Sequence, residues 1–129
     1  MAIKIVDASA IAAVLFNEPQ AVEMTQKLAA ASLIAPTLFW FEMASICLKK
    51  MTQYPDKREA VLQAYTLLDN FDIKPVEVDH QAVVSLAEQT GITTYDASYL
   101  WLAKTHCAEL VTLDKQLQKK MATLTNNQP

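Results

Sequence analysis

Four short apolar segments, separated from one another by helical patterns, constrain the fold of this chain more than any other feature. They span residues 3–6, 33–35, 72–78 and 109–113. Short apolar strands that alternate with helices predict an α/β fold, with a central, mostly parallel sheet of four to five short strands flanked by helices. Pro75 interrupts the third segment, which places that strand at an edge or a bend. In such folds ligands bind outside the carboxyl ends of the strands.

The helices expected between these strands have recognisable ends. Asp79 is a good N-cap for a helix that Gly91 ends, and Thr93 or Thr94 caps the next one. Pro36 is expected near the first position of a long helix. Helical patterns cover residues 8–16, 21–30, 37–51, 57–68, 80–90, 94–106 and a short stretch after 114. The length fits one domain, expected over residues 1–124, followed by a frayed tail at 125–129.

Composition excludes several classes of protein. The single glycine leaves no room for a P-loop or a dinucleotide-binding loop. A net charge of −3 argues against a basic nucleic-acid binder, although not against an enzyme that reaches nucleic acid through metal ions. We expect no membrane span and no signal peptide. Cys47 and Cys107 lie in apolar helical patterns, which favours buried free thiols and a cytoplasmic location.

Four acidic residues stand in apolar surroundings: Asp7, Glu42, Asp96 and Asp114. Each has a structural interpretation when it is taken alone. Asp7 and Asp114 follow strands and could be helix N-caps, and Asp96 lies in a first helical turn, where a negative charge suits the helix dipole. Glu42 is harder to explain in this way, because its neighbours three and four positions on, Ser45 and Ile46, include no cation.

Taken together, the same four residues predict a shared site. Asp7 and Asp114 end strands, and Glu42 and Asp96 lie in early turns of helices that begin at the same edge of the sheet. Carboxylates that converge raise one another's pKa unless a cation compensates them. All-oxygen ligands favour Mg²⁺ or Mn²⁺ over zinc. Such ions activate water and stabilise the charge that develops on a phosphodiester under attack, which indicates a nuclease.

These four stretches also resemble the signature of a known family. Val6-Asp7-Ala8-Ser9 is similar to the opening of PIN domains, and Glu42 is similar to the family's helical glutamate. The stretch Thr94-Tyr95-Asp96-Ala97-Ser98-Tyr99-Leu100 resembles VapC-type toxins, the ribonuclease half of VapBC toxin–antitoxin pairs. Val111-Thr112-Leu113-Asp114 resembles the last motif of the family, and the resemblance covers nearly the whole chain.

The resemblance implies a Mg²⁺- or Mn²⁺-dependent endoribonuclease with Asp7, Glu42, Asp96 and Asp114 as the metal-site acids. It implies that Ser9 and Thr112 support the pocket by hydrogen bonds and that Tyr95 is a packing residue. A VapB-like antitoxin is the implied partner. The apolar helix over residues 39–51 suggests a homodimer, and at least one ring of Phe39-Trp40-Phe41 is expected to face a partner. The family's last strand has only a poor counterpart at 121–124.

Three other interpretations compete with that of a metal-dependent nuclease. A phosphoacceptor receiver domain needs an adjacent acidic pair after the first strand, but Ala8 follows Asp7. A haloacid-dehalogenase-like phosphatase needs Asp-x-Asp there, and Ser9 occupies the second position. A catalytically inactive interaction protein on a PIN scaffold is the remaining alternative, which the loss of an acid would support.

Overall fold

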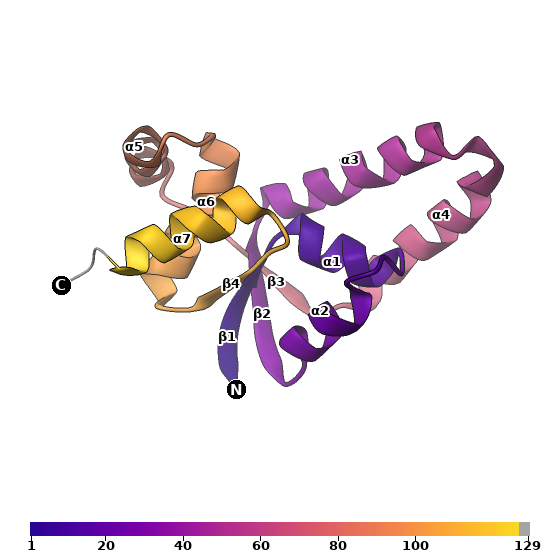
Figure 1. Cartoon of the computed structure of the whole chain (residues 1–129), viewed down its shortest axis with the longest axis horizontal. Coiled ribbons are helices and arrows are strands. Elements are labelled where there is room, and N and C mark those ends of the chain that lie inside the picture. Colours follow the sequence, from indigo (N-terminus) through magenta and orange to yellow (C-terminus); the bar gives the residue numbers. More distant parts are fainter. Residues whose placement is uncertain (127–129) are drawn as a thin grey trace.

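Parallel strands in the middle of the molecule and helices around them form the architecture in Figure 1. The computed structural model describes residues 1–126. Its strands are β1 Ala2–Val6, β2 Ala31–Pro36, β3 Ile73–Val76 and β4 Glu109–Val111. Its helices are α1 Ala8–Leu15, α2 Ala21–Leu28, α3 Leu38–Gln53, α4 Arg58–Thr66, α5 His80–Thr90, α6 Thr94–His106 and α7 Lys115–Asn126, with short 3₁₀ turns η1 Pro55–Lys57 and η2 Leu67–Asn70.

The four strands are parallel and lie in the order β3-β2-β1-β4. The chain therefore moves outward from β1 through β2 to β3 and then returns to the other side of β1. This reversal places a topological switch point between β1 and β4, which is where α/β sheets open a crevice for ligands. Pro75 lies on β3, an edge strand, as its missing N–H predicts.

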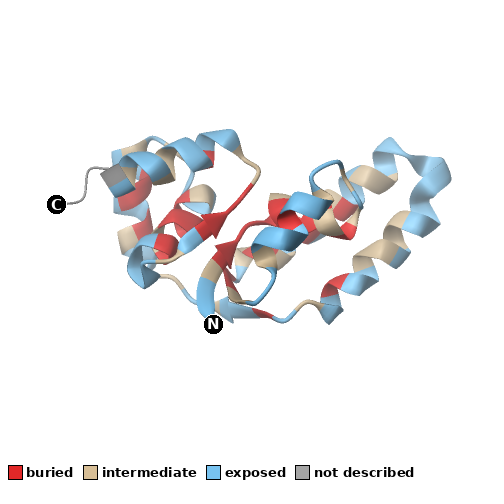
Figure 2. Cartoon of the chain, turned by 60° about the horizontal axis from the view of Figure 1, so that its bottom comes forward, coloured by how far each residue is buried: buried red, intermediate tan, exposed pale blue. Residues whose placement is uncertain are grey.

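The core is built from the apolar sides of the sheet and of the helices that cover it. Ile5 and Val6 at the end of β1 are completely buried, and α6 packs across β1, β2 and β4. Strands buried on both faces need continuous runs of β-branched and aliphatic residues, which explains the four apolar segments of the sequence. The buried residues in Figure 2 are concentrated in this central part of the molecule.

The predicted ends of α5 and α6 are confirmed by their hydrogen bonds. The Asp79 carboxylate accepts the backbone N–H of Ala82 at 3.2 Å, and the Thr93 hydroxyl accepts that of Asp96 at 3.1 Å. Gly91 ends α5 with a φ of 72°, a left-handed conformation that suits glycine.

Helices α3 and α4 form a hairpin that extends away from the rest of the molecule (Figure 1). The buried residues of α3 are Phe39, Met43 and Cys47, all in its first ten positions, and α4 has none. Figure 2 shows the outer part of the hairpin as exposed or half-buried. The first part of α3 is therefore anchored in the core, whereas the outer part of the hairpin is held mainly by contacts between its own two helices.

Two local expectations, on Pro36 and on Cys107, are wrong, and among the described residues the sheet has four strands, the lower of the two numbers expected. Pro36 ends β2, where it pairs with Val76, and α3 begins only at Leu38; a strand end tolerates a residue without N–H as well as a helix start does. Helix α7 continues through residues 121–126, so the described chain has no fifth strand. Cys107 is exposed at the left-handed end of α6, whereas Cys47 is buried. The rest of the expected tail, 127–129, lies outside the described residues.

Candidate active site

Two of the predicted acids lie at the switch point of the sheet. Asp7 follows β1 directly, and Asp114 comes three residues after the end of β4. The backbone N–H of Asp7 donates to the Val111 carbonyl at 3.2 Å, which joins the ends of the two strands. Each carboxylate also caps a helix: Asp7 accepts from Ala10 N–H, and Asp114 accepts from Leu117 N–H. The switch point thus brings together residues from opposite ends of the chain.

Asp7 is the most buried of the four acids, with 7% of its surface exposed. Its Oδ1 accepts a hydrogen bond from the Ser9 hydroxyl at 2.7 Å, and its Oδ2 accepts one from the Thr112 hydroxyl at 2.6 Å. Together with the amide of Ala10, these donors fix the carboxylate plane. A buried carboxylate needs such donors to offset its lost hydration.

Ser9 and Thr112 also order the loop after β4. The N–H of Leu113 donates to the Ser9 hydroxyl at 2.9 Å, and the N–H of Asp114 donates to the Thr112 hydroxyl at 3.0 Å. The same two hydroxyls therefore orient Asp7 and set the backbone from which Asp114 projects.

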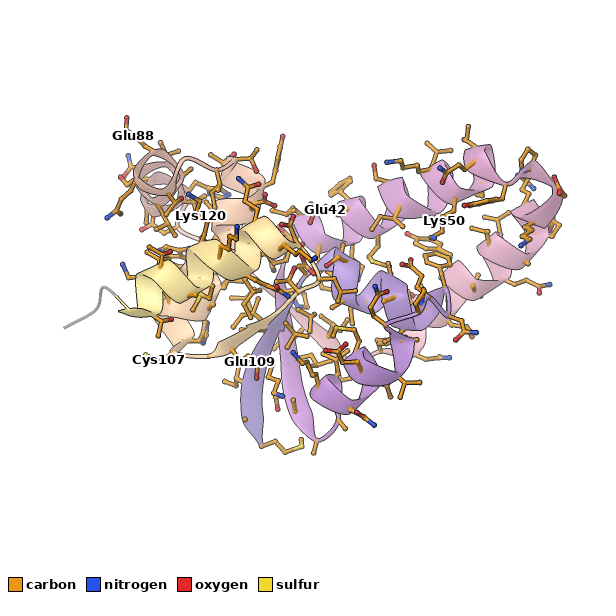
Figure 3. The ribbon with its side chains drawn as sticks, viewed as in Figure 1. Glu42, Lys50, Glu88, Cys107, Glu109 and Lys120 are labelled. Atoms are coloured by element: carbon orange, nitrogen blue, oxygen red, sulfur yellow. The ribbon has the colours of Figure 1, made fainter. Side chains whose placement is uncertain are left out.

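Glu42 has one strong partner, which sequence reasoning missed. The Tyr99 hydroxyl on α6 donates to Oε1 of Glu42 on α3, and Tyr99 is only 1% exposed. Tyr99 lies three positions after Asp96, on the same side of the helix. That spacing, within a stretch already singled out, was the available signal. Figure 3 shows Glu42 at the end of α3 that lies nearest the sheet.

All four acids line one pocket, with a volume of about 730 Å³. The sequence predicted that they converge, and the structure brings them together. Ser9 lines the pocket as well, whereas Thr112 acts from behind it through Asp7. Tyr95 also opens onto the pocket and is 64% exposed, so its expected role as a packing residue is wrong. As the second residue of α6, its side chain lies on the outer side of the first turn.

Burial and neighbouring carboxylates raise the pKa of three of the acids, Asp7, Glu42 and Asp96. Burial raises the pKa of Asp7 above its ordinary value in spite of its hydrogen bonds, and the charge of Asp114 adds to the increase. Burial also raises the pKa of Glu42, with the charges of Asp7 and Asp96 contributing. The pKa of Asp96 is raised by burial and by Asp114. The pocket therefore concentrates negative charge that favours a cation.

The donor set fits a hard divalent cation. Every acid offers oxygen, and none of the ion pairs between described residues involves one of the four carboxylates. Within residues 1–126, however, no three Asp, Glu, His or Cys side chains are close enough to hold an ion directly. Two direct carboxylates with several retained waters suit Mg²⁺, which gives up its hydration reluctantly. The residues that could supply oxygens are Asp7, Glu42, Asp96 and Asp114.

Comparison with known proteins places this pocket in a family. The sequence profile of the PIN domain matches residues 4–123, which is most of the chain and includes all four acids. The chain belongs to the PIN domain family. PIN domains are typically nucleases and usually need divalent metal ions. The receiver-domain and phosphatase interpretations are thereby removed.

One solved structure shares the whole PIN fold. The crystal structure of PAE2754 from Pyrobaculum aerophilum superposes with a TM-score of 0.72 at 25% sequence identity, over 95% of this chain and 92% of that one. A search of curated proteins gives no match. Among the described helices of this PIN domain, none is long and apolar enough to cross a membrane.

Proposed function

We propose that this PIN domain is a Mg²⁺- or Mn²⁺-dependent endoribonuclease. One observation carries the proposal: four carboxylates from separate parts of the chain line a single pocket at the switch point of the sheet. The raised pKa values of Asp7, Glu42 and Asp96 indicate a site that is incomplete without a cation. Burial and the negative net charge both make such a cluster of carboxylates unfavourable for folding. A role in binding or catalysis is the simplest explanation for its presence.

The four acids would have different roles in holding the cation. Asp7, which Ser9 and Thr112 hold rigidly, and Asp96 would bind the cation most directly. Glu42, oriented by Tyr99, and Asp114, oriented by its own helix cap, would bind it through water. The bound cation supplies Lewis acidity and a water of lowered pKa. The pocket, open to solvent, leaves room for the phosphodiester.

The direct test is RNA cleavage by variants that neutralise one acid. Asp7→Asn and Asp96→Asn should lower the rate of Mn²⁺-dependent cleavage by at least about 100-fold, because a metal-binding acid contributes several kcal/mol to the transition state. Purified protein would be tested on a panel of structured RNAs, with and without Mn²⁺. Asp69→Asn, at an exposed carboxylate of η2, is the matched control and should cleave like wild type. Cleavage that persists in both variants in excess EDTA contradicts the proposal.

We further propose that the enzyme is the toxin of a VapBC-type pair, is cytoplasmic, and forms a homodimer. The motif around Asp96 supports the toxin assignment. Leu48 on α3 and Leu67 in η2 are large apolar residues that stay exposed, which supports an interface on the hairpin.

The test of this part is the product of the neighbouring reading frame. A VapB-like antitoxin should bind the chain and block RNA cleavage at a stoichiometric ratio. Light scattering should give the mass of a dimer for the wild type, and Leu48→Glu should shift it toward the monomer. If the chain is a monomer at high micromolar concentration and does not bind the neighbouring gene product, the homodimer and the toxin assignment are both contradicted.

A further inference from the structure

The pocket extends beyond the four acids along α3. Glu42, Ser45, Ile46 and Lys49 follow one another on one side of this helix, and all of them line the pocket. Lys49 is the only lysine or arginine among the described residues that line it. Its position is seven residues after Glu42, which corresponds to a rise of about 10 Å along the helix.

Lys49 is exposed, and none of the ion pairs between described residues involves it. Its neighbour Lys50 differs in this respect. The Nζ of Lys50 lies 3.3 Å from a Glu18 carboxylate oxygen and 5.2 Å from the centre of the Phe16 ring. Figure 3 shows Lys50 farther along α3 than Glu42. Lys50 is therefore engaged within the protein, whereas the ammonium group of Lys49 is available to a ligand.

A second hollow continues the pocket on the far side of Lys49. It has a volume of about 470 Å³ and shares Ser9, Ile46 and Lys49 with the acidic pocket. It adds the amide side chains of Gln20 and Gln53 and the ion pair of Glu18 with Lys50, in which the Glu18 charge is compensated. The two hollows together form a track from the acids past Lys49, and a chain-like ligand can follow it.

Two exposed aromatic rings open onto the acidic end of this track. Phe41 on α3 is 81% exposed and Tyr95 on α6 is 64% exposed, and both line the pocket. Core packing does not account for either ring. Exposed rings beside a backbone-binding groove are the usual platform on which proteins stack the bases of single strands.

We propose that this track binds a single-stranded RNA segment, with Lys49 on a backbone phosphate within about three nucleotides of the scissile one and with Phe41 and Tyr95 stacked on bases. The inference rests on the proposed nuclease function, since the acids place the scissile phosphate. A rise of about 10 Å corresponds to roughly three nucleotides at duplex spacing, and to fewer in an extended strand. A duplex does not suit the track, because the faces of paired and stacked bases are not accessible to the rings.

The test compares Lys49→Gln with Lys119→Gln, an exposed lysine of α7 that lines neither hollow. Both changes alter the net charge equally. The Asp7→Asn background prevents cleavage, and the probe is fluorescein-labelled hexauridylate, followed by anisotropy from 50 to 200 mM salt. Lys49→Gln should weaken binding about tenfold. It should also reduce the slope of log affinity against log salt by about 0.7, the value for one lost single-strand phosphate contact. Lys119→Gln should do neither.

A double-mutant cycle, which combines Lys49→Gln with a change in the RNA, identifies the phosphate that Lys49 contacts. Methylphosphonate, placed at each position of the hexamer in turn, removes the charge of one phosphate. At one position the neutral linkage should weaken binding to the parent protein but not to Lys49→Gln. Phe41→Leu and Tyr95→Leu should each weaken binding roughly tenfold, because stacking is lost. Tyr54→Leu, at an exposed ring outside the acidic pocket, should leave it unchanged.

Two results overturn the inference. Equal affinities and salt slopes for Lys49→Gln and Lys119→Gln remove Lys49 from the binding site. Tighter binding of an RNA duplex than of the single strand removes the stacking platform. These outcomes are distinct from a failure of the proposed function, which would appear as a wild-type protein without metal-dependent cleavage whatever the binding data show.

Discussion

At the scale of single residues, the helix-cap and metal-site interpretations of Asp7 and Asp114 are compatible. Each carboxylate accepts a helix amide with Oδ1 and still lines the acidic pocket. Sequence patterns predicted both roles, but only the fold shows that one side chain can satisfy both. The spacing of Tyr99 from Asp96 could have placed it at the site, but its partner Glu42 could not be assigned from the sequence, because it lies 57 positions away. Contacts between helices of that separation depend on how the helices pack.

Tyr99 offers the sharpest single-residue prediction. Tyr99→Phe keeps the buried ring and removes the hydroxyl that orients Glu42. Loss of a group that orients a metal ligand typically lowers metal affinity by 10–100-fold. We expect that loss in Mn²⁺ binding measured by calorimetry, together with a destabilisation of about 1 kcal/mol. Tyr95→Phe, which removes an exposed hydroxyl, is the control. Wild-type Mn²⁺ affinity in a folded Tyr99→Phe protein would show that the hydrogen bond is only structural.

At the scale of elements, the sequence predicted most helices and strands because their signals are local. A helix cap bonds backbone groups only a few positions away in the sequence, as is seen for Asp79, Gly91 and Thr93. The extended hairpin of α3 and α4 was not predicted, since apolar residues such as Leu48 look like core in the sequence but stay exposed. Whether an apolar face is covered depends on the rest of the fold: the sequence predicted that at least one ring of Phe39-Trp40-Phe41 faces outward, but only the fold identifies it as Phe41.

Helix α4, the outer helix of the hairpin, should open independently of the sheet. Helix α4 has no buried residue, whereas α6 buries six of its thirteen. Local openings have low free energies where few apolar contacts must break. Hydrogen exchange followed by mass spectrometry should therefore show α4 exchanging much faster than α6 under native conditions. Equal protection of the two helices at low protein concentration would mean that the hairpin is part of the cooperative core.

At the scale of the whole molecule, the acidic site links stability to pH and metal. The pKa values of Asp7, Glu42 and Asp96 are raised in the folded state. The folded protein therefore holds protons that the unfolded chain has already released, so stability is greatest in acid and decreases as the pH rises. The decrease begins above the ordinary carboxylate values of 3.8 for Asp and 4.5 for Glu and ends once the pH exceeds the raised pKa values.

Thermal unfolding in EDTA should thus show a lower Tm at pH 8 than at pH 5. Mn²⁺ at about 100 times its Kd should restore about 2.7 kcal/mol of stability at pH 8 and much less at pH 5, where protons compete for the same oxygens. The same titration in Asp96→Asn should show a weaker dependence on pH. A Tm in EDTA that rises steadily from pH 5 to pH 8 would contradict the electrostatic account of the pocket.

The pairing of β1 with β4 has a consequence for protein synthesis. Strand β1 is synthesised before the other three strands but lies inside the sheet, so one of its edges stays unpaired until Glu109–Val111 have emerged from the ribosome. The hydroxyl that orients Asp7 belongs to Thr112, which is translated 105 residues later. A nascent or prematurely terminated chain that ends before this point carries three of the four acids but not the arrangement that joins them. Cleaving activity, where the site supports it, would therefore require that Thr112 and Asp114 have left the ribosome and that β4 has paired with β1.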